Sequence, residues 1–153
     1  MPKTVYLRTP LSEEDVRSLA IDDVVYLTGE AYTMMYISHF TRLIGMMKAG
    51  EPLPMELEGR AIYNTGTIFK RNEDGSYDFR AIGATTSSKF NAYTPEFIRR
   101  SGVRAVIGKG GMDKATLDAM RECGCVYLAV AGGCSAIYTP SVTLEKEYWP
   151  QPS

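Results

Sequence analysis

The segment that most constrains the fold runs from residue 103 to residue 133 and has the pattern strand, helix, strand. "VRAVIGKGG" is an apolar run that ends in glycines, "MDKATLDAMRECG" has the pattern of a helix that Gly124 ends, and "CVYLAVAGG" is a second apolar run. Parallel strands need a crossover of this kind, because a tight turn joins only antiparallel strands. The segment therefore predicts parallel strands and an α/β fold.

The first third of the chain continues the alternation of strands and helices. We expect strands at residues 4–8 ("TVYLR") and 24–29 ("VVYLTG"), and between them a helical turn that the Ser12 hydroxyl caps. Residues 36–49 place their apolar side chains on one helical face, and Gly50 follows where the helix should end.

A hairpin is expected in the middle of the chain. "AIYNTGTIF" at residues 61–69 and "SYDFRAIG" at residues 76–83 flank the pair Asp74-Gly75, which is a common hairpin turn. This section is therefore predicted to be antiparallel. Together with the parallel crossover, it predicts an α/β domain with a mixed sheet.

A further helix should follow the hairpin. Thr94 is expected as its N-cap, Pro95 suits its first turn, and Gly102 suits its end. The predicted order of elements is therefore strands and helices in alternation, interrupted by one hairpin.

Composition limits the classes of function. The 153 residues suit a single domain over 1–153, and a net charge of -1 gives no indication of nucleic acid as a partner. No apolar run approaches the roughly 20 residues that cross a membrane, and the N-terminus does not resemble a signal peptide, so we expect a cytoplasmic protein. Three cysteines without a secretory signal predict reduced thiols.

The glycine-rich turn "GKGG" at residues 108–111 is the first candidate site. Glycines after a buried strand let backbone N–H groups approach an anion, and Lys109 adds a compact positive charge. The turn does not match a phosphate loop, and Asp113 stands where a dinucleotide fingerprint needs its third glycine. An anion site and a purely structural turn both remain open.

The stretch "IGATTSSKF" at residues 82–90 is the second candidate, because it places four hydroxyl side chains beside a lysine. It is either an exposed turn whose hydroxyls satisfy local backbone groups or a polar cradle for substrate oxygens. In the second case Thr85 or Thr86 could donate hydrogen bonds or transfer a proton, with Lys89 and Lys109 as electrostatic helpers, while the serines shape the turn.

The remaining reactive side chains have structural alternatives. His39 is the only histidine and is either a structural hydrogen-bonding group or a polar partner near the site. Cys123 and Cys125 lack the spacing of a zinc or redox pair, and Cys134 follows a strand in a turn of small residues. We therefore expect no metal site in this chain.

The motifs "VVYLTG", "IGATTSSKF", "YTPEFI", "VIGKGGM" and "VYLAVAGGCSA", in this order, resemble the beta subunit, or C-terminal domain, of class I iron–sulfur hydro-lyases. This family comprises class I fumarate hydratase and L(+)-tartrate dehydratase. The resemblance covers nearly the whole chain and implies a swivelling three-layer β/β/α domain.

The resemblance also implies a division of labour between two parts. The alpha part holds a four-iron, four-sulfur cluster whose open iron binds a small hydroxydicarboxylate, and the beta part closes the site. The family's proposed catalytic base falls on Thr85 and its substrate-binding lysine on Lys109, with Lys89, Thr86 and His39 as further substrate contacts. We therefore expect a fumarate hydratase beta subunit that is inactive without its alpha partner, in a hetero-oligomer or as a homodimer of the beta chain.

Three departures from the family pattern leave alternatives open. Lys89 replaces an arginine, and the family's ARDxAH aligns with "MMYISH", so that Met35 and Tyr36 replace an arginine and an aspartate. Family members also continue beyond the segment "VTLEKEYW", so a shortened paralogue or a fragment is expected. The alternatives to fumarate are a tartrate dehydratase beta subunit and a non-catalytic binding or regulatory module.

Overall fold

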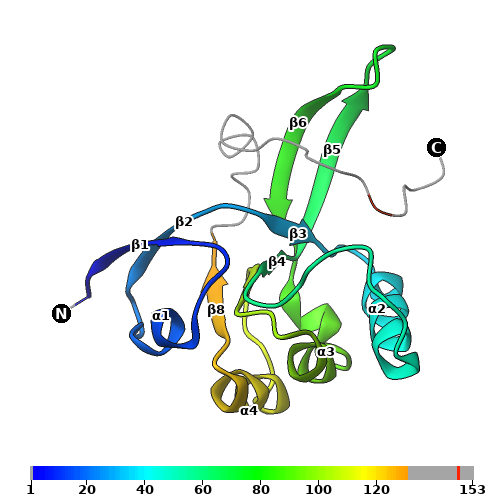
Figure 1. Ribbon diagram of the computed structural model, residues 1–153. Coiled ribbons are helices and arrows are strands. Elements are labelled where there is room, and N and C mark those ends of the chain that lie inside the picture. The colour runs from blue at the N-terminus through cyan, green and yellow to red at the C-terminus, as the bar shows by residue number, and fades with distance from the viewer. Residues whose placement is uncertain (1, 131–147, 149–153) are drawn as a thin grey trace.

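A parallel four-stranded sheet lies at the centre of the computed structural model (Figure 1). Its strands, in spatial order, are β3 (Ala31–Thr33), β4 (Ala61–Tyr63), β7 (Ala105–Gly108) and β8 (Val126–Ala129). The helix α4 (Lys114–Cys123) joins β7 to β8, which pair in parallel. The predicted crossover is therefore confirmed.

The structure describes residues 2–130 and Tyr148, with the side chains of residues 66–69 and 77–82 left aside. The expectations about Cys134 and about the end of the chain lie outside the described residues.

Helices cover one face of the central sheet. These are α2 (Ile37–Ala49), α3 (Thr94–Ser101) and α4. Ile62 of β4 and Val106 of β7 point toward them and join a core with Phe40 and Phe97, whose rings meet edge to face at 5.4 Å. All four side chains are fully buried. Burying side chains of this size contributes about 1.5–3 kcal/mol each, so this core holds the helices on the sheet.

A second core lies on the opposite face of the sheet. There the neighbouring residues Ala61 and Ala105 pack with Leu7 of β1 (Thr4–Arg8) and Leu27 of β2 (Val24–Thr28). β1 and β2 form a parallel pair, with the short helix α1 (Glu13–Arg17) between them in sequence. Small alanines on this face and larger side chains on the other give the sheet two different packing surfaces.

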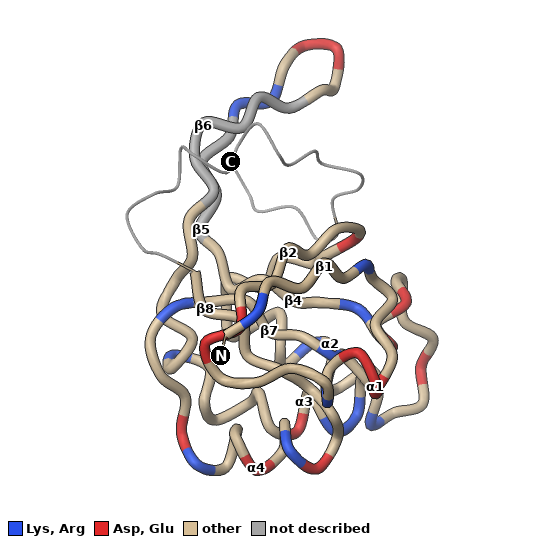
Figure 2. Tube along the Cα trace, turned by 90° about the vertical axis from the view of Figure 1, so that its left-hand side faces the viewer, with Lys and Arg blue, Asp and Glu red and all other residues tan. Residues whose placement is uncertain are grey.

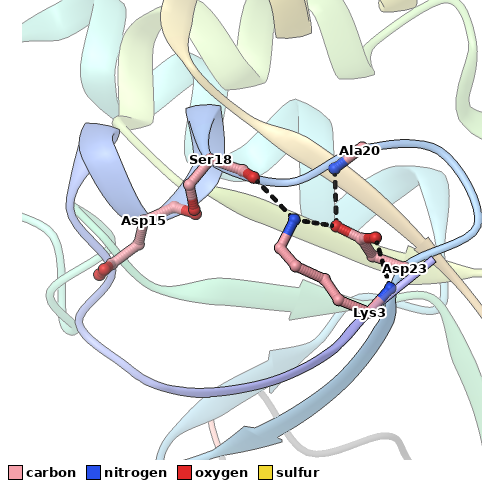
Figure 3. Close-up of polar contacts among 5 residues, drawn as sticks. All are labelled: Lys3, Asp15, Ser18, Ala20 and Asp23. Carbon is pink, nitrogen blue, oxygen red and sulfur yellow. Dashed lines mark hydrogen bonds and ion pairs between the residues drawn. The ribbon is translucent and has the colours of Figure 1, made fainter. Parts of the chain in front are cut away.

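An ion pair ties the start of β1 to the turn before β2 (Figure 3). Lys3 Nζ lies 2.8 Å from Asp23 Oδ2 and also donates to the Ser18 carbonyl, while the Ala20 N–H donates to Asp23 Oδ2. The hydrogen bond from Lys3, followed by bonds from backbone N–H groups, lowers the pKa of Asp23 to about 2. The carboxylate is therefore ionised throughout the physiological range.

The predicted helix ends agree with the structure at all but one position. Ser12 and Asp15 form a capping box at α1, and Gly50, Gly102 and Gly124 adopt the left-handed conformation at the ends of α2, α3 and α4.

The prediction that Thr94 is an N-cap is wrong. Tyr93 is the N-cap, and the Thr94 hydroxyl donates backward to the Phe90 carbonyl at 2.9 Å. The 3-10 turn Ser87–Phe90 leads almost directly into α3, which places the Phe90 carbonyl, already bonded to the Tyr93 N–H, within reach of this hydroxyl as well.

The predicted hairpin is confirmed as β5 (Thr65–Arg71) and β6 (Tyr77–Ala84), which pair antiparallel and extend away from the rest of the described fold (Figure 1). Figure 2 shows acidic and basic residues close together near its tip. The single mixed sheet that we expected is not present among the described residues. The antiparallel strands form a sheet of their own.

The parallel sheet and the antiparallel hairpin are separate because the chain changes its strand partner at Asn64. The Asn64 N–H donates to the Ile107 carbonyl at 2.8 Å and extends the pairing of β4 with β7. The Asn64 carbonyl instead accepts from the Thr85 N–H at 2.8 Å and begins the pairing with the end of β6. One residue therefore joins the two sheets.

The side chain of Asn64 is also hydrogen-bonded at both its oxygen and its nitrogen, and it is only 1% exposed. Its Oδ1 accepts from the Ser87 hydroxyl at 2.9 Å, and its Nδ2 donates to the Met34 carbonyl at 3.3 Å. Ser87 in turn lies directly over Gly108, where a Cβ atom would overlap the Ser87 hydroxyl. The end of β7 therefore requires glycine.

Gly108→Ala should lower the free energy of unfolding by about 1–3 kcal/mol through overpacking. Ser87→Ala alone should cost about 1–3 kcal/mol, because it leaves the buried Asn64 Oδ1 without its donor. The double variant should lose less free energy of unfolding than the sum of the two single variants. The reason is that Ser87→Ala removes the hydroxyl with which the new Cβ atom of Gly108→Ala collides. Urea unfolding of the single and double variants measures this coupling.

Gly111→Ala is the matched control, because a Cβ atom there meets no atom within 4 Å. Its expected effect is within about 0.5 kcal/mol. Strict additivity of the Gly108 and Ser87 substitutions would contradict the proposed contact.

Candidate functional site

The two candidate motifs lie side by side at the carboxyl end of the central sheet. Thr86 and Lys109 form a parallel β-bridge, and the Ser87 N–H donates to the Lys109 carbonyl at 3.1 Å. In open α/β sheets, ligands bind beyond the carboxyl ends of the strands. The structure therefore brings Thr85, Thr86 and Lys109 together where a ligand is expected.

Thr85 has the most unusual environment of these residues. Its hydroxyl oxygen is inaccessible to solvent and has no hydrogen-bond partner among the described residues. Leaving a buried polar group unpaired costs about 1–3 kcal/mol. An orphaned hydroxyl beside a lysine-bearing turn is therefore suited to a ligand that supplies the missing partner.

The two lysines differ in their settings. Lys109 is half-buried, between Gly108 and Gly110, and Gly110 has a φ of +78° that favours glycine. Lys89 is exposed on the 3-10 turn, and its N–H donates to the Thr86 carbonyl. Lys109 is thus the better placed of the two lysines to bind an anionic ligand at the end of the sheet, while Lys89 lies on the surface.

The four hydroxyls of this stretch separate into different roles. Ser87 is buried and bonded to Asn64, and Ser88 is exposed. Ser87 therefore shapes the turn, as predicted, whereas Thr85 keeps an unpaired hydroxyl.

His39 lies in the first turn of α2, and its Nδ1 accepts the Met35 N–H at 3.2 Å. This bond assigns the proton of the neutral ring to Nε2. Burial, and next the nearby Arg42, lower the pKa of His39 from its ordinary value of 6.5, so the ring is neutral at neutral pH. His39 therefore makes a structural hydrogen bond through Nδ1, and the substrate contact expected of it, through Nε2–H, stays a prediction.

No described hydrogen bond joins His39 directly to Thr85 or Lys109. The hydrogen bonds that connect the two regions pass through Asn64, whose Nδ2 donates to the carbonyl of Met34, the residue before Met35. Sequence reasoning missed Asn64. The available signal was one amide within the apolar run "AIYNTGTIF".

The described residues do not fit an iron–sulfur cluster. No three His, Cys, Asp or Glu side chains within residues 2–130 and 148 could together hold a metal ion. Cys125 is buried, and burial raises the pKa of its thiol to about 12, the opposite of what a thiolate ligand needs. Cys123 and Cys125 are both free thiols.

The structure contains no helix, in the part that it describes, with the length and apolar character to span a membrane.

Comparisons with known proteins identify the family. The model of the family described as "Fumarase C-terminus" matches residues 1–147. The putative L(+)-tartrate dehydratase subunit beta of Methanocaldococcus jannaschii is 40% identical over 137 residues, which cover 90% of this chain and 69% of the relative.

Two further relatives support the same assignment. The L(+)-tartrate dehydratase subunit beta of Escherichia coli K12 is 33% identical over 144 residues, which cover 94% of this chain and 69% of the relative. A putative fumarate hydratase class I of Geobacillus stearothermophilus is 34% identical over 140 residues, which cover 92% of this chain but 26% of the relative. The chain therefore belongs to the fumarase C-terminus family, among the beta subunits of the class I fumarate hydratase and tartrate dehydratase hydro-lyases.

Proposed function

We propose that this chain is the beta subunit of a hydro-lyase that dehydrates a hydroxydicarboxylate of the L(+)-tartrate type, together with an alpha subunit. The observation that carries the proposal is the unpaired, buried Thr85 hydroxyl, next in the chain to Thr86, which bridges to Lys109. The relatives favour tartrate over our first expectation of fumarate. The two tartrate dehydratase relatives are beta subunits and one of them is 40% identical to this chain, whereas the fumarate hydratase relative is 34% identical.

Dehydration breaks a C–H bond and the neighbouring C–OH bond and leaves a carbon–carbon double bond. In the proposed mechanism Thr85 Oγ1 accepts the proton from the substrate carbon. A neutral threonine hydroxyl is too weak a base for this step, so Thr85 acts as the alkoxide, after its own proton has passed to a base of the alpha subunit. The positive charge of Lys109, across the Thr86–Lys109 bridge, stabilises this alkoxide. Lys109 also binds a substrate carboxylate, with Thr86 and Lys89 as secondary contacts.

Met35 and Tyr36 support a substrate that carries hydroxyl groups. They stand where the family resemblance expects an arginine and an aspartate, so these two positions supply no charge to the proposed site. The neutral donors there are the Tyr36 hydroxyl, on a side chain that is 42% exposed, and His39 Nε2–H. Tartrate has two hydroxyl groups for such donors, whereas fumarate has none.

We further propose that the alpha subunit supplies the groups for the leaving hydroxyl, including a four-iron, four-sulfur cluster, because the described residues of this chain do not fit one. The two cores on opposite faces of the central sheet support the swivelling three-layer β/β/α arrangement. We also propose a single domain over residues 1–153, a cytoplasmic location, and a hetero-oligomer in preference to a homodimer.

The proposal is tested by co-expression with an alpha subunit of this family, anaerobic cluster reconstitution, and assays with L(+)-tartrate, malate, fumarate and mesaconate. We expect the highest kcat/KM with L(+)-tartrate and no turnover by the beta chain alone. A higher kcat/KM with fumarate would restore the fumarate hydratase interpretation. A reconstituted complex that is inactive with every substrate would favour the non-catalytic module.

Thr85→Val should lower kcat by about 100-fold or more, because it removes the proton acceptor. The same variant should be as stable as the wild type or more stable, because valine has nearly the shape of threonine and removes an unpaired polar atom. Kinetics of the reconstituted complex and urea unfolding of the chain measure the two effects.

Thr65→Val is the matched control for Thr85→Val. Thr65 is also buried, but its hydroxyl donates to the Gly83 carbonyl at 2.7 Å, so its loss should reduce stability. Full activity of Thr85→Val would exclude Thr85 as the proton acceptor.

Lys109→Met should lower kcat/KM by about 30-fold or more, the equivalent of the 2–5 kcal/mol lost when a buried carboxylate loses its charged partner. Lys89→Met should have a smaller effect, because Lys89 is exposed and water screens its charge. Steady-state kinetics of the two variants give the comparison, and a larger loss for Lys89 would reverse the proposed roles.

A further inference from the structure

Asn64 lies between the two halves of the proposed site. On one side its amide group bonds to Met34, whose neighbour Met35 holds His39. On the other side its carbonyl bonds to the N–H of Thr85 and its Oδ1 to the hydroxyl of Ser87. The residue therefore contacts both segments without being near the surface.

The orientation of the Asn64 amide follows from its partners. The Met34 carbonyl can only accept a hydrogen bond, so the group that faces it at 3.3 Å must be the NH₂. Ser87 then donates to Oδ1, and the Tyr127 hydroxyl donates to Ser87 Oγ at 3.3 Å. A chain of three donors thus runs in one direction from Tyr127 to the Met34 carbonyl and leaves no freedom for the amide to flip.

The Met34–Met35 peptide connects this chain of hydrogen bonds to His39. Its carbonyl is held by Asn64 Nδ2, and its N–H is the donor to His39 Nδ1. Because the peptide group is planar, fixing the carbonyl also fixes the direction of the N–H on its other side. The orientation of the His39 ring therefore depends on Asn64, 25 residues away in the sequence.

We propose that Asn64 is a positioning residue. It fixes the Met34–Met35 peptide, which orients His39, relative to the end of β6, which carries the Thr85 hydroxyl. Its effect on turnover rests on the proposed function. Its effect on His39 rests only on the hydrogen bonds described above, and this allows the two to be tested apart.

His39 is a convenient reporter because it is the only histidine in the chain. Among the described residues, Arg42 is the charged group that acts on it, and Tyr36 meets its ring edge to face at 5.4 Å. A bond accepted by Nδ1 is available only to the unprotonated ring, so it favours the neutral form. Releasing the Met35 N–H should therefore raise the pKa of His39 toward its ordinary value.

The experiment is an NMR titration of the full chain. In the wild type, protonation of His39 breaks its bond with Met35, so the Met35 amide resonance should titrate together with the ring. Asn64→Leu removes both side-chain bonds but keeps a similar volume. It should abolish the titration of the Met35 amide and shift the pKa of His39 upward.

Two variants serve as controls. Ser87→Ala removes only the Oδ1 bond and should leave the His39 titration unchanged, because the Met34 bond remains. Thr94→Val removes another buried hydroxyl bond, to the Phe90 carbonyl, on a different path. An unchanged His39 titration in Asn64→Leu would overturn the proposal, and so would an equal shift in Thr94→Val.

If Asn64→Leu does not fold, Asn64→Ser gives the same test, because the shorter serine side chain does not reach the Met34 carbonyl. In the complex with the alpha subunit, Asn64→Leu should lower kcat by about 10- to 100-fold through misplacement of the catalytic groups, while Thr94→Val keeps the wild-type kcat. Wild-type kcat in Asn64→Leu would overturn the catalytic role. An inactive wild-type complex would instead refute the proposed function and leave the NMR test of positioning intact.

Discussion

At Asn64 the chain stops pairing with β7 and begins pairing with the end of β6, and the candidate site lies around the hydrogen bonds made there. The exchange brings Thr85 beside β4 and lets Thr86 bridge to Lys109. Because backbone bonds set these positions, the site depends on the join between two sheets rather than on one loop.

Most of the local structure could be predicted from the sequence, because its causes are local. Ser12 and Gly124 act on the nearest turn of their own helices, and Asp74-Gly75 closes its own hairpin. The partner change at Asn64 could not be predicted, because it depends on Ile107 and Thr85, which are distant in sequence. The prediction of Thr94 as an N-cap was wrong for a related reason, because the Thr94 hydroxyl donates to the carbonyl of Phe90.

The candidate site was predicted in part for the same reasons. Thr85 and Lys109 belong to motifs that can be recognised in the sequence, and their neighbourhood follows from the order of strands. The family resemblance already set Thr85 apart from the serines, but the physical reason for the difference could not be predicted, because it depends on which hydroxyl Asn64 binds. The Ser87 hydroxyl donates its hydrogen bond to Asn64, which lies more than 20 positions away in the sequence.

The unfavourable features of the structure gather at this one end of the sheet. The Thr85 hydroxyl is buried without a partner among the described residues, Gly108 must stay small for Ser87, and Asn64 is an amide that is almost fully buried. The cores around Phe97 and Ala105, by contrast, follow the ordinary alternation of strand side chains. Proteins tend to break local rules at functional sites and rely on the rest of the fold for stability. The concentration of these features beside Lys109 is therefore an argument, independent of the family, for a ligand at this end of the sheet.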